Sequence, residues 1–248
     1  SDGRTILIAV ADRVELWDVE SEELVFPLLL HHETVLNASW DVEGSRIISI
    51  TKGASVHYWD ADTGDSLGDS QTGLVIDELD RVEFSPDYRL AVLVENSSAR
   101  LLNVIEGKPV GPSLEHGDEI LSISFSEDSK QLATTSRDYT ARVWNTENGT
   151  SLSSPLYHPS DVNQAVFDFS GTFLATACAD RNVRVWDLET GQMSGQPMLH
   201  RSEVSQLHFC GDGRRLVTGS SRISPGLGIA GNMVGAEIRL WDLANINK

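Results

Sequence analysis

The chain has 248 residues, of which 40% are hydrophobic and 23% are charged, so its composition excludes wholesale disorder. Its 19 lysine and arginine residues face 37 aspartate and glutamate residues, and the net charge of −18 disfavours nucleic acid and anionic membrane surfaces as partners. The two cysteines, Cys178 and Cys210, signal no disulfide framework, and no apolar run reaches the roughly 18 residues of a membrane span. We therefore expect a cytoplasmic protein that contacts neither nucleic acid nor membrane.

The first predicted strand, Thr5–Ala9, precedes a second strand that carries Trp17. The same local pattern returns in five later segments, one of which is degraded and has leucine in place of tryptophan: Trp59, Leu102, Trp144, Trp186 and Trp241. Successive copies are 42 or 43 residues apart, except that the last copy follows after 55 residues. This register indicates an internal repeat of about 42 residues, with a 13-residue insertion in the final copy.

Within one repeat, the pattern predicts strands and turns and no helix. Leu121–Ser126 alternates apolar and small polar residues, as a half-buried strand does, and the turn Glu127–Lys130 leads to a second strand at Gln131–Thr135. A tight turn at Arg137–Tyr139 precedes the tryptophan strand, and a more polar fourth strand follows a Thr-Gly turn such as Thr190–Gly191. Four short antiparallel strands in each repeat correspond to one blade of a propeller.

These landmarks resemble the WD40 family, and the resemblance covers essentially the whole chain. The connecting pattern Gly-x-Pro-x-x-His, at Gly111–His116 and Gly195–His200, is similar to bacterial WD40 arrays, which are often attached to protein kinase or nucleotide-switch ATPase domains. The resemblance implies an all-β propeller of four-stranded antiparallel blades. Six blades are recognisable, and a seven-bladed ring is the alternative.

We expect a single propeller domain over residues 1–248. Its first blade lacks a first strand and its last blade lacks a fourth strand, so we expect the chain to be a piece of a longer protein with further domains attached. The repeat units are 1–19 (partial), 20–61, 62–104 (degraded), 105–146, 147–188 and 189–243, the last with an insertion at 222–235.

The resemblance also implies a hydrogen-bonded chain that joins a histidine, a hydroxyl, an aspartate and the tryptophan of one blade. Two copies match it: His116, Thr134 or Ser136, Asp138 and Trp144, and then His158, Thr176, Asp180 and Trp186. A hydrolytic triad is the other interpretation of such a set. We favour a structural role, because the set occurs twice at the same offsets and no Gly-x-Ser-x-Gly elbow accompanies it.

The other copies depart from this pattern. Gly53 stands at the aspartate position of the His31 copy, and the third copy has Leu74 and Asn96 at the histidine and aspartate positions. In the last copy, the insertion displaces the aspartate. We expect apolar packing to hold these blades in the main, and we expect them to be less rigid than the two complete ones.

The insertion contains Gly226–Gly231, which satisfies G-x-G-x-x-G, but the run continues into a strand and not into the helix that a dinucleotide site needs. We interpret the segment as a loop that docks a partner or packs over the channel. Its apolar residues for that role are Ile223, Leu227, Ile229 and Met233. Neither the histidines nor the carboxylates have metal-ligand spacing, so we expect no metal and no cofactor.

We expect a non-catalytic scaffold or sensor module of a larger signalling or nucleotide-switch protein, which binds a protein or peptide, of basic character given the acidic chain. The alternatives are an enzyme or small-ligand binder, with a pocket at the channel mouth capped by the glycine-rich insertion, and a purely architectural unit. By family analogy, the contact residues on the rim are Asp118, Glu119, Arg137, Tyr139, Asp161, Arg181, Arg201 and Glu203.

Overall fold

The computed structural model describes residues 3–72, 79–211, 215–223 and 233–243. These ranges contain 23 β-strands and no α-helix, which confirms the all-β class. The strands are rich in valine, isoleucine and threonine, whose branched side chains pack well on a pleated surface.

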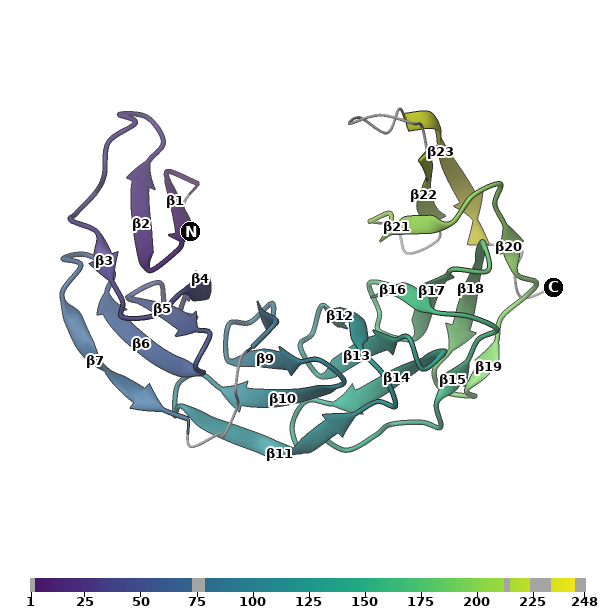
Figure 1. Ribbon diagram of the computed structural model, residues 1–248, viewed down its shortest axis with the longest axis horizontal. Helices are drawn as coiled ribbons and strands as arrows, with labels where there is room; N and C mark the ends of the chain where they lie inside the picture. The colour runs from purple at the N-terminus through teal and green to yellow at the C-terminus, as the bar shows by residue number, and fades with distance from the viewer. Residues whose placement is uncertain (1–2, 73–78, 212–214, 224–232, 244–248) are drawn as a thin grey trace. The chain divides into compact units, whose positions relative to one another are not determined.

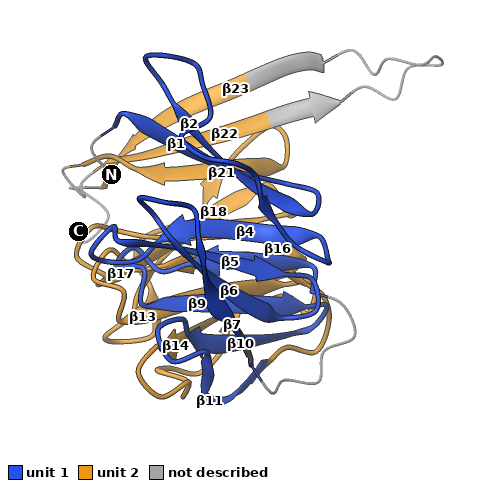
Figure 2. Ribbon diagram, turned by 90° about the vertical axis from the view of Figure 1, so that its left-hand side faces the viewer, with its two compact units in different colours: residues 1–114 blue, residues 115–248 orange. Residues whose placement is uncertain are grey.

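The chain divides into two compact units, residues 1–114 and residues 115–248 (Figure 2). Each unit contains three antiparallel sheets, which we number as blades 1 to 3 in unit 1 and blades 4 to 6 in unit 2. The six sheets confirm the propeller-blade architecture. A single domain over the whole chain and the size of a ring stay predictions.

Unit 1 begins with a three-stranded blade, which is followed by two four-stranded blades (Figure 1). Blade 1 contains β1 (Thr5–Val10), β2 (Arg13–Asp18) and β3 (Leu29–Leu30); blade 2 contains β4 (Val35–Trp40), β5 (Arg46–Thr51), β6 (Ser55–Asp60) and β7 (Ser66–Gln71); blade 3 contains β8 (Arg81–Phe84), β9 (Leu90–Glu95), β10 (Ser98–Asn103) and β11 (Lys108–Glu115).

Unit 2 ends with a three-stranded blade. Blade 4 contains β12 (Ile120–Phe125), β13 (Gln131–Ser136), β14 (Thr140–Asn145) and β15 (Leu156–Tyr157); blade 5 contains β16 (Val162–Phe167), β17 (Phe173–Cys178), β18 (Asn182–Asp187), β19 (Gln192–Met193) and β20 (Met198–Leu199); blade 6 contains β21 (Val204–Phe209), β22 (Arg215–Ile223) and β23 (Met233–Asp242).

The fourth strand is short in blades 4 and 5 of unit 2. In blade 5 it is split into β19 and β20, which both pair with β18, and Pro197 lies directly before β20. In blade 4, Pro155 directly precedes the two-residue β15. Because proline has no N–H to donate, it interrupts the ladder at these positions.

An apolar cluster lies between each pair of neighbouring blades within a unit. In unit 1, Ile47 of β5 packs with Val14 and Leu16 of blade 1. In unit 2, Val143 of β14 packs with Val162 of blade 5. A blade therefore buries its apolar surface mainly against its neighbours, as expected of stacked repeats.

Antiparallel pairing defines two faces in each unit. In blades 2 to 6, the turn between the second and third strands lies on what we call the upper face, and the turns between first and second or third and fourth strands lie on the lower face. In blade 1, the upper turn is the one between β1 and β2, where the Ala11 carbonyl accepts from Val35 N at the start of β4. Each upper turn in blades 1 to 5 holds one non-glycine residue in the left-handed region, at φ between 49° and 70°: Ala11, Ala54, Asn96, Tyr139 and Arg181. This backbone shape fixes the direction of the turn at a conformational cost.

Candidate interaction surface

In blade 4, the Thr134 hydroxyl joins a buried histidine to a buried tryptophan. Trp144 Nε1 donates to Thr134 Oγ1 at 2.8 Å, and His116 Nε2 lies 2.7 Å from the same oxygen. On its other side, His116 Nδ1 lies 2.9 Å from Asp138 Oδ2. A carboxylate only accepts, so Nδ1 carries the proton, and the Thr134 hydroxyl donates to Nε2.

The same histidine–hydroxyl–tryptophan trio occurs in four blades. Its other copies are His31–Ser49–Trp59, His158–Thr176–Trp186 and His200–Thr218–Trp241, with donor–acceptor distances of 2.7–3.0 Å. This corrects the expectation that apolar packing in the main holds the incomplete copies. The trio depends on the hydroxyl 18 residues after each histidine, which blades 2 and 6 keep.

Blade 3 is the blade that apolar packing holds. Leu93 and Leu102, at the hydroxyl and tryptophan positions, are fully buried in one apolar cluster. Leu74, predicted at the histidine position, lies outside the described residues. The upper turn of this blade is nevertheless capped, because Asp80 Oδ2 accepts from Asn96 N at 2.6 Å.

Asp138 stabilises the upper turn of blade 4. Its carboxylate accepts from Gly117 N at 2.9 Å and from the Thr140 hydroxyl at 2.6 Å. Burial raises the pKa of Asp138, but these bonds and the one from His116 outweigh it and lower the pKa to about 2. The turn therefore holds an ionised carboxylate at neutral pH.

Asp180 has a different partner from the one expected. It forms an ion pair with Arg184, at 2.6 Å between Oδ2 and Nη2, and no bond joins it to His158. His158 Nδ1 donates its hydrogen bond to the Leu156 carbonyl oxygen at 2.9 Å. The Asp180 carboxylate is therefore available to pair with Arg184. Burial raises the pKa of Asp180, but the Arg184 hydrogen bond and others lower it to about 2.

Carboxylates from other positions serve the blades that lack the turn aspartate. In blade 2, Glu33 Oε2 accepts from Thr51 Oγ1 at 2.9 Å and from Gly53 N at 3.1 Å. In blade 6, the Glu237 carboxylate accepts from Arg239 at 2.6 Å and from the Arg201 backbone. Sequence reasoning missed these residues, because they do not lie at the offset of the aspartate that they replace.

The histidine–aspartate–serine set does not form a triad in blade 4. Ser136 Oγ donates to the Asp118 carbonyl at 2.8 Å, and the hydroxyl that contacts His116 belongs to Thr134, which is fully buried. A buried hydroxyl with both neighbours bonded to it cannot attack a substrate. The arrangement is suited to structural support.

All eight predicted rim residues lie on the upper face of unit 2, in the upper turns or just before a first strand. Two contacts join some of them: Arg137 Nε lies 3.0 Å from Glu119 Oε2, and Asn163 of blade 5 donates to Glu203 Oε1 at 2.7 Å. The Tyr139 side chain is 49% exposed, and Arg181 is also exposed. The surface is mixed in charge, because it carries Asp118 and Asp161 as well as Arg181 and Arg201.

The insertion extends from the upper turn of blade 6. Its stem continues the β22–β23 ladder as far as the pair Ile223 and Met233. Leu227 and Ile229 lie outside the described residues, and so do the side chains of Ile223 and Met233. The insertion leaves the trio intact, since Trp241 Nε1 still donates to Thr218 at 3.0 Å.

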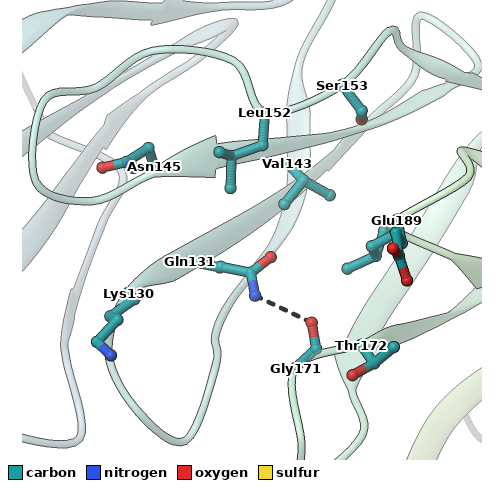
Figure 3. A pocket seen from close by; sticks show the side chains of 10 residues that line it. Lys130, Gln131, Val143, Asn145, Leu152, Ser153, Gly171, Thr172 and Glu189 are labelled. Carbon is teal, nitrogen blue, oxygen red and sulfur yellow. Dashed lines mark hydrogen bonds between the residues drawn. The ribbon is translucent and has the colours of Figure 1, made fainter.

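Unit 2 also has a groove of about 470 Å³ on its lower face, between blades 4 and 5 (Figure 3). Its apolar wall includes Val143 and Leu152, and Gln131 Nε2 donates to the Gly171 carbonyl at 2.9 Å beside it. Within the described ranges, no three histidine, cysteine or acidic side chains gather as a metal site would require. No helix there could cross a bilayer.

Residues 107–145 and 149–187 match the family model described as "WD domain, G-beta repeat". No curated protein matches the chain. Among solved structures, the chain is similar to the computationally designed Ika8 protein, with a TM-score of 0.71 and 18% identity over 98% of this chain and 69% of that one. A likeness at this identity shows the fold alone.

Proposed function

Because residues 107–145 and 149–187 match a WD-repeat family model, we propose that the chain is a WD40-repeat protein and a non-catalytic scaffold that binds a protein or peptide on the upper face of unit 2. WD40 propellers are typically non-catalytic, and their repeats generally mediate protein–protein interaction. The observation that carries the proposal is the pair of upper turns that hold Tyr139 and Arg181 exposed on a fixed backbone.

Both turns are constrained from two sides. Tyr139 and Arg181 have φ values of 67° and 70°, and their carbonyls accept from His158 N and His200 N, each at 2.9 Å. The preceding residue in each turn is an aspartate with a pKa of about 2. Strained backbone held in this way is typical of functional positions, and tyrosine and arginine are the residue types that dominate binding energy at interfaces.

The wider setting of the scaffold is also part of the proposal. The Gly-x-Pro-x-x-His connectors support a place in a larger signalling or nucleotide-switch protein with further domains attached. Two unpaired cysteines, of which Cys178 is buried, support a reducing cytoplasm. The net charge of −18 supports a basic protein partner and disfavours nucleic acid and anionic membranes.

The groove of unit 2 is not the pocket that the small-ligand alternative requires. That alternative requires a pocket beneath the glycine-rich insertion, which leaves unit 2 on the upper face. The groove of about 470 Å³ lies on the lower face, at the start of β13 and β17.

Selection from a random-peptide display library tests the proposal. Selected peptides should bind with micromolar Kd, and the double variant Tyr139→Asn, Arg181→Asn should weaken them at least tenfold. Asparagine tolerates positive φ, so these changes remove the side chains and keep the turns. Glu22→Asn is the matched control, because Glu22 is exposed at φ 57° in the turn between β2 and β3 of unit 1. Peptides that bind the double variant as well as the original protein would contradict the proposal.

A further inference from the structure

The lower face of unit 1 carries two neighbouring grooves that share Asp41, Val42 and Glu43. One, of about 510 Å³, lies between blades 1 and 2, and the other, of about 360 Å³, lies between blades 2 and 3. We propose that the larger groove binds a lysine or arginine side chain of a basic peptide, and that the smaller groove takes an apolar side chain of the same peptide. The idea rests on the proposed function as a peptide-binding scaffold, but it concerns a different surface.

The larger groove has the chemistry of a site for an organic cation. Three carboxylates line it, those of Asp41, Glu43 and Asp62, together with the aromatic rings of Trp40 and Tyr88. Among the described residues that line it, none is lysine or arginine. Carboxylates and aromatic faces both attract a cation, and Leu16 and Val25 offer an apolar wall for the methylenes of its stem.

Two of the three carboxylates of this groove are placed for an incoming cation. The third, Asp41, is held at the turn, because its Oδ1 accepts from Ser45 N at 2.9 Å and its Oδ2 lies 3.8 Å from Arg46 Nε. Glu43 and Asp62 are exposed on the lips of the groove. A long side chain entering between them would keep its charged end near water and carboxylate oxygens.

The smaller groove differs in chemistry and suits an apolar side chain. Arg46 and Arg89 line it beside Asp41 and Glu43, so its charges balance, and its remaining wall includes Ile48, Tyr58 and Ile105. Val42, shared by both grooves, is 50% exposed, and Ile105 is 55% exposed. Exposed apolar side chains around a groove favour an apolar occupant.

Charge complementarity favours a basic peptide at unit 1 over unit 2. Residues 1–114 contain 8 lysine and arginine residues and 21 aspartate and glutamate residues, whereas residues 115–248 contain 11 and 16. The lower-face groove of unit 2 has Lys130 and Glu189 at its edge and, within the described part of the chain, no aromatic lining residue (Figure 3). It therefore provides an internal reference that should not select a cation.

The test titrates the protein with synthetic ten-residue glycine–serine peptides that carry one arginine and one leucine, one to four residues apart. The readout is the indole N–H signal of Trp40 in NMR spectra, assigned with Trp40→Phe. We expect that signal to shift on titration. The affinity for the peptide should fall at least fivefold in the double variant Glu43→Gln, Asp62→Asn. It should fall by a similar factor, with the original protein, when citrulline replaces the arginine of the peptide. Val42→Ser should weaken binding of the leucine peptide and not of a peptide with serine in place of leucine.

The control variant Glu127→Gln, Glu189→Gln removes two exposed carboxylates from the lower face of unit 2 and should leave binding unchanged. Equal weakening in that control would show attraction to the net charge alone and would overturn the proposal. A stationary Trp40 signal, or equal affinity for the citrulline peptide, would overturn it as well. None of these outcomes depends on Tyr139 or Arg181, so failure here is distinguishable from failure of the proposed function.

Discussion

Blade 2 of unit 1 and blade 4 of unit 2 contain the same buried trio, but they obtain their upper-turn carboxylate from different places. In blade 4, Asp138 lies in the turn itself and contacts His116 directly. In blade 2, Gly53 occupies that position, and Glu33 reaches in from the segment before the first strand. We conclude that the upper turn of a blade needs a carboxylate at one place in space, whichever residue supplies it.

Acidification should change the free energy of unfolding more than any of the substitutions described below. Burial lowers the pKa of His31 and of His158 to about 4, against 6.5 in the unfolded chain. Their contribution to stability is therefore complete above pH 6.5 and is lost as the pH falls through about 4, at about 1.4 kcal/mol for each unit of pKa depression. Urea unfolding between pH 7 and pH 4.5 should show a steady decline.

The two blades should differ in their share of that decline. Burial also lowers the pKa of His116, but the hydrogen bond and charge of Asp138 raise it in part. His31→Gln should thus reduce the pH dependence of unfolding more than His116→Gln does. An equal reduction in the two variants would mean that the direct aspartate contact has no electrostatic consequence.

Removal of the shared hydroxyl comes next in size. Thr134→Val keeps the shape of the side chain but leaves His116 Nε2 and Trp144 Nε1 without their partner, which should cost about 3 kcal/mol of unfolding free energy. Ser49→Ala should act in the same direction in blade 2, because it removes the partner of His31 and Trp59.

Thr135 supplies the control for that measurement. It neighbours Thr134 on β13 and is fully buried, and its hydroxyl has no hydrogen-bond partner among the described residues. Thr135→Val should therefore leave the urea midpoint unchanged or raise it. A loss as large as that of Thr134→Val would assign the effect to packing and not to the trio.

Substitutions at Gly53 and Glu33 test whether Glu33 replaces the turn aspartate, and they should give the smallest change in unfolding free energy. A side chain at Gly53 would start 2.5 Å from Glu33 Oε2, so Gly53→Asp alone should destabilise by about 2 kcal/mol. Glu33→Ala alone should cost about 1 kcal/mol through its lost hydrogen bonds. The double variant restores the arrangement of blade 4, and urea unfolding should show it to be more stable than the sum of the two single changes. If the two changes in unfolding free energy simply added, Glu33 would not be replacing the turn aspartate.

The sequence predicts the blades better than it predicts the connections within them. The tryptophan register locates the strands, because it follows the spacing of a regular sheet. Two of the four trios were predicted, and those of blades 2 and 6 were missed because the aspartate was taken as part of the pattern. The roles of Glu33, Asp80 and Glu237 could not be predicted, since each depends on how a side chain crosses a turn that sequence spacing does not describe. The partner of Asp180 was missed for a related reason. The carbonyl oxygen that accepts the hydrogen bond of His158 Nδ1 is a backbone group, and it has no sequence signature.

The long hairpin of blade 6 has a practical consequence. Its trio spans 23 residues from Thr218 to Trp241, where the trio of blade 4 spans 10, and the tryptophan N–H donates to the hydroxyl at 3.0 Å in the one and 2.8 Å in the other. The insertion thus leaves the buried bonds of the trio in place, and the β22–β23 ladder continues beyond them as far as the pair Ile223 and Met233. Upper turns of this repeat are accordingly natural attachment points for grafted loops, and protein engineers could vary such a loop while the supporting blade stays as it is.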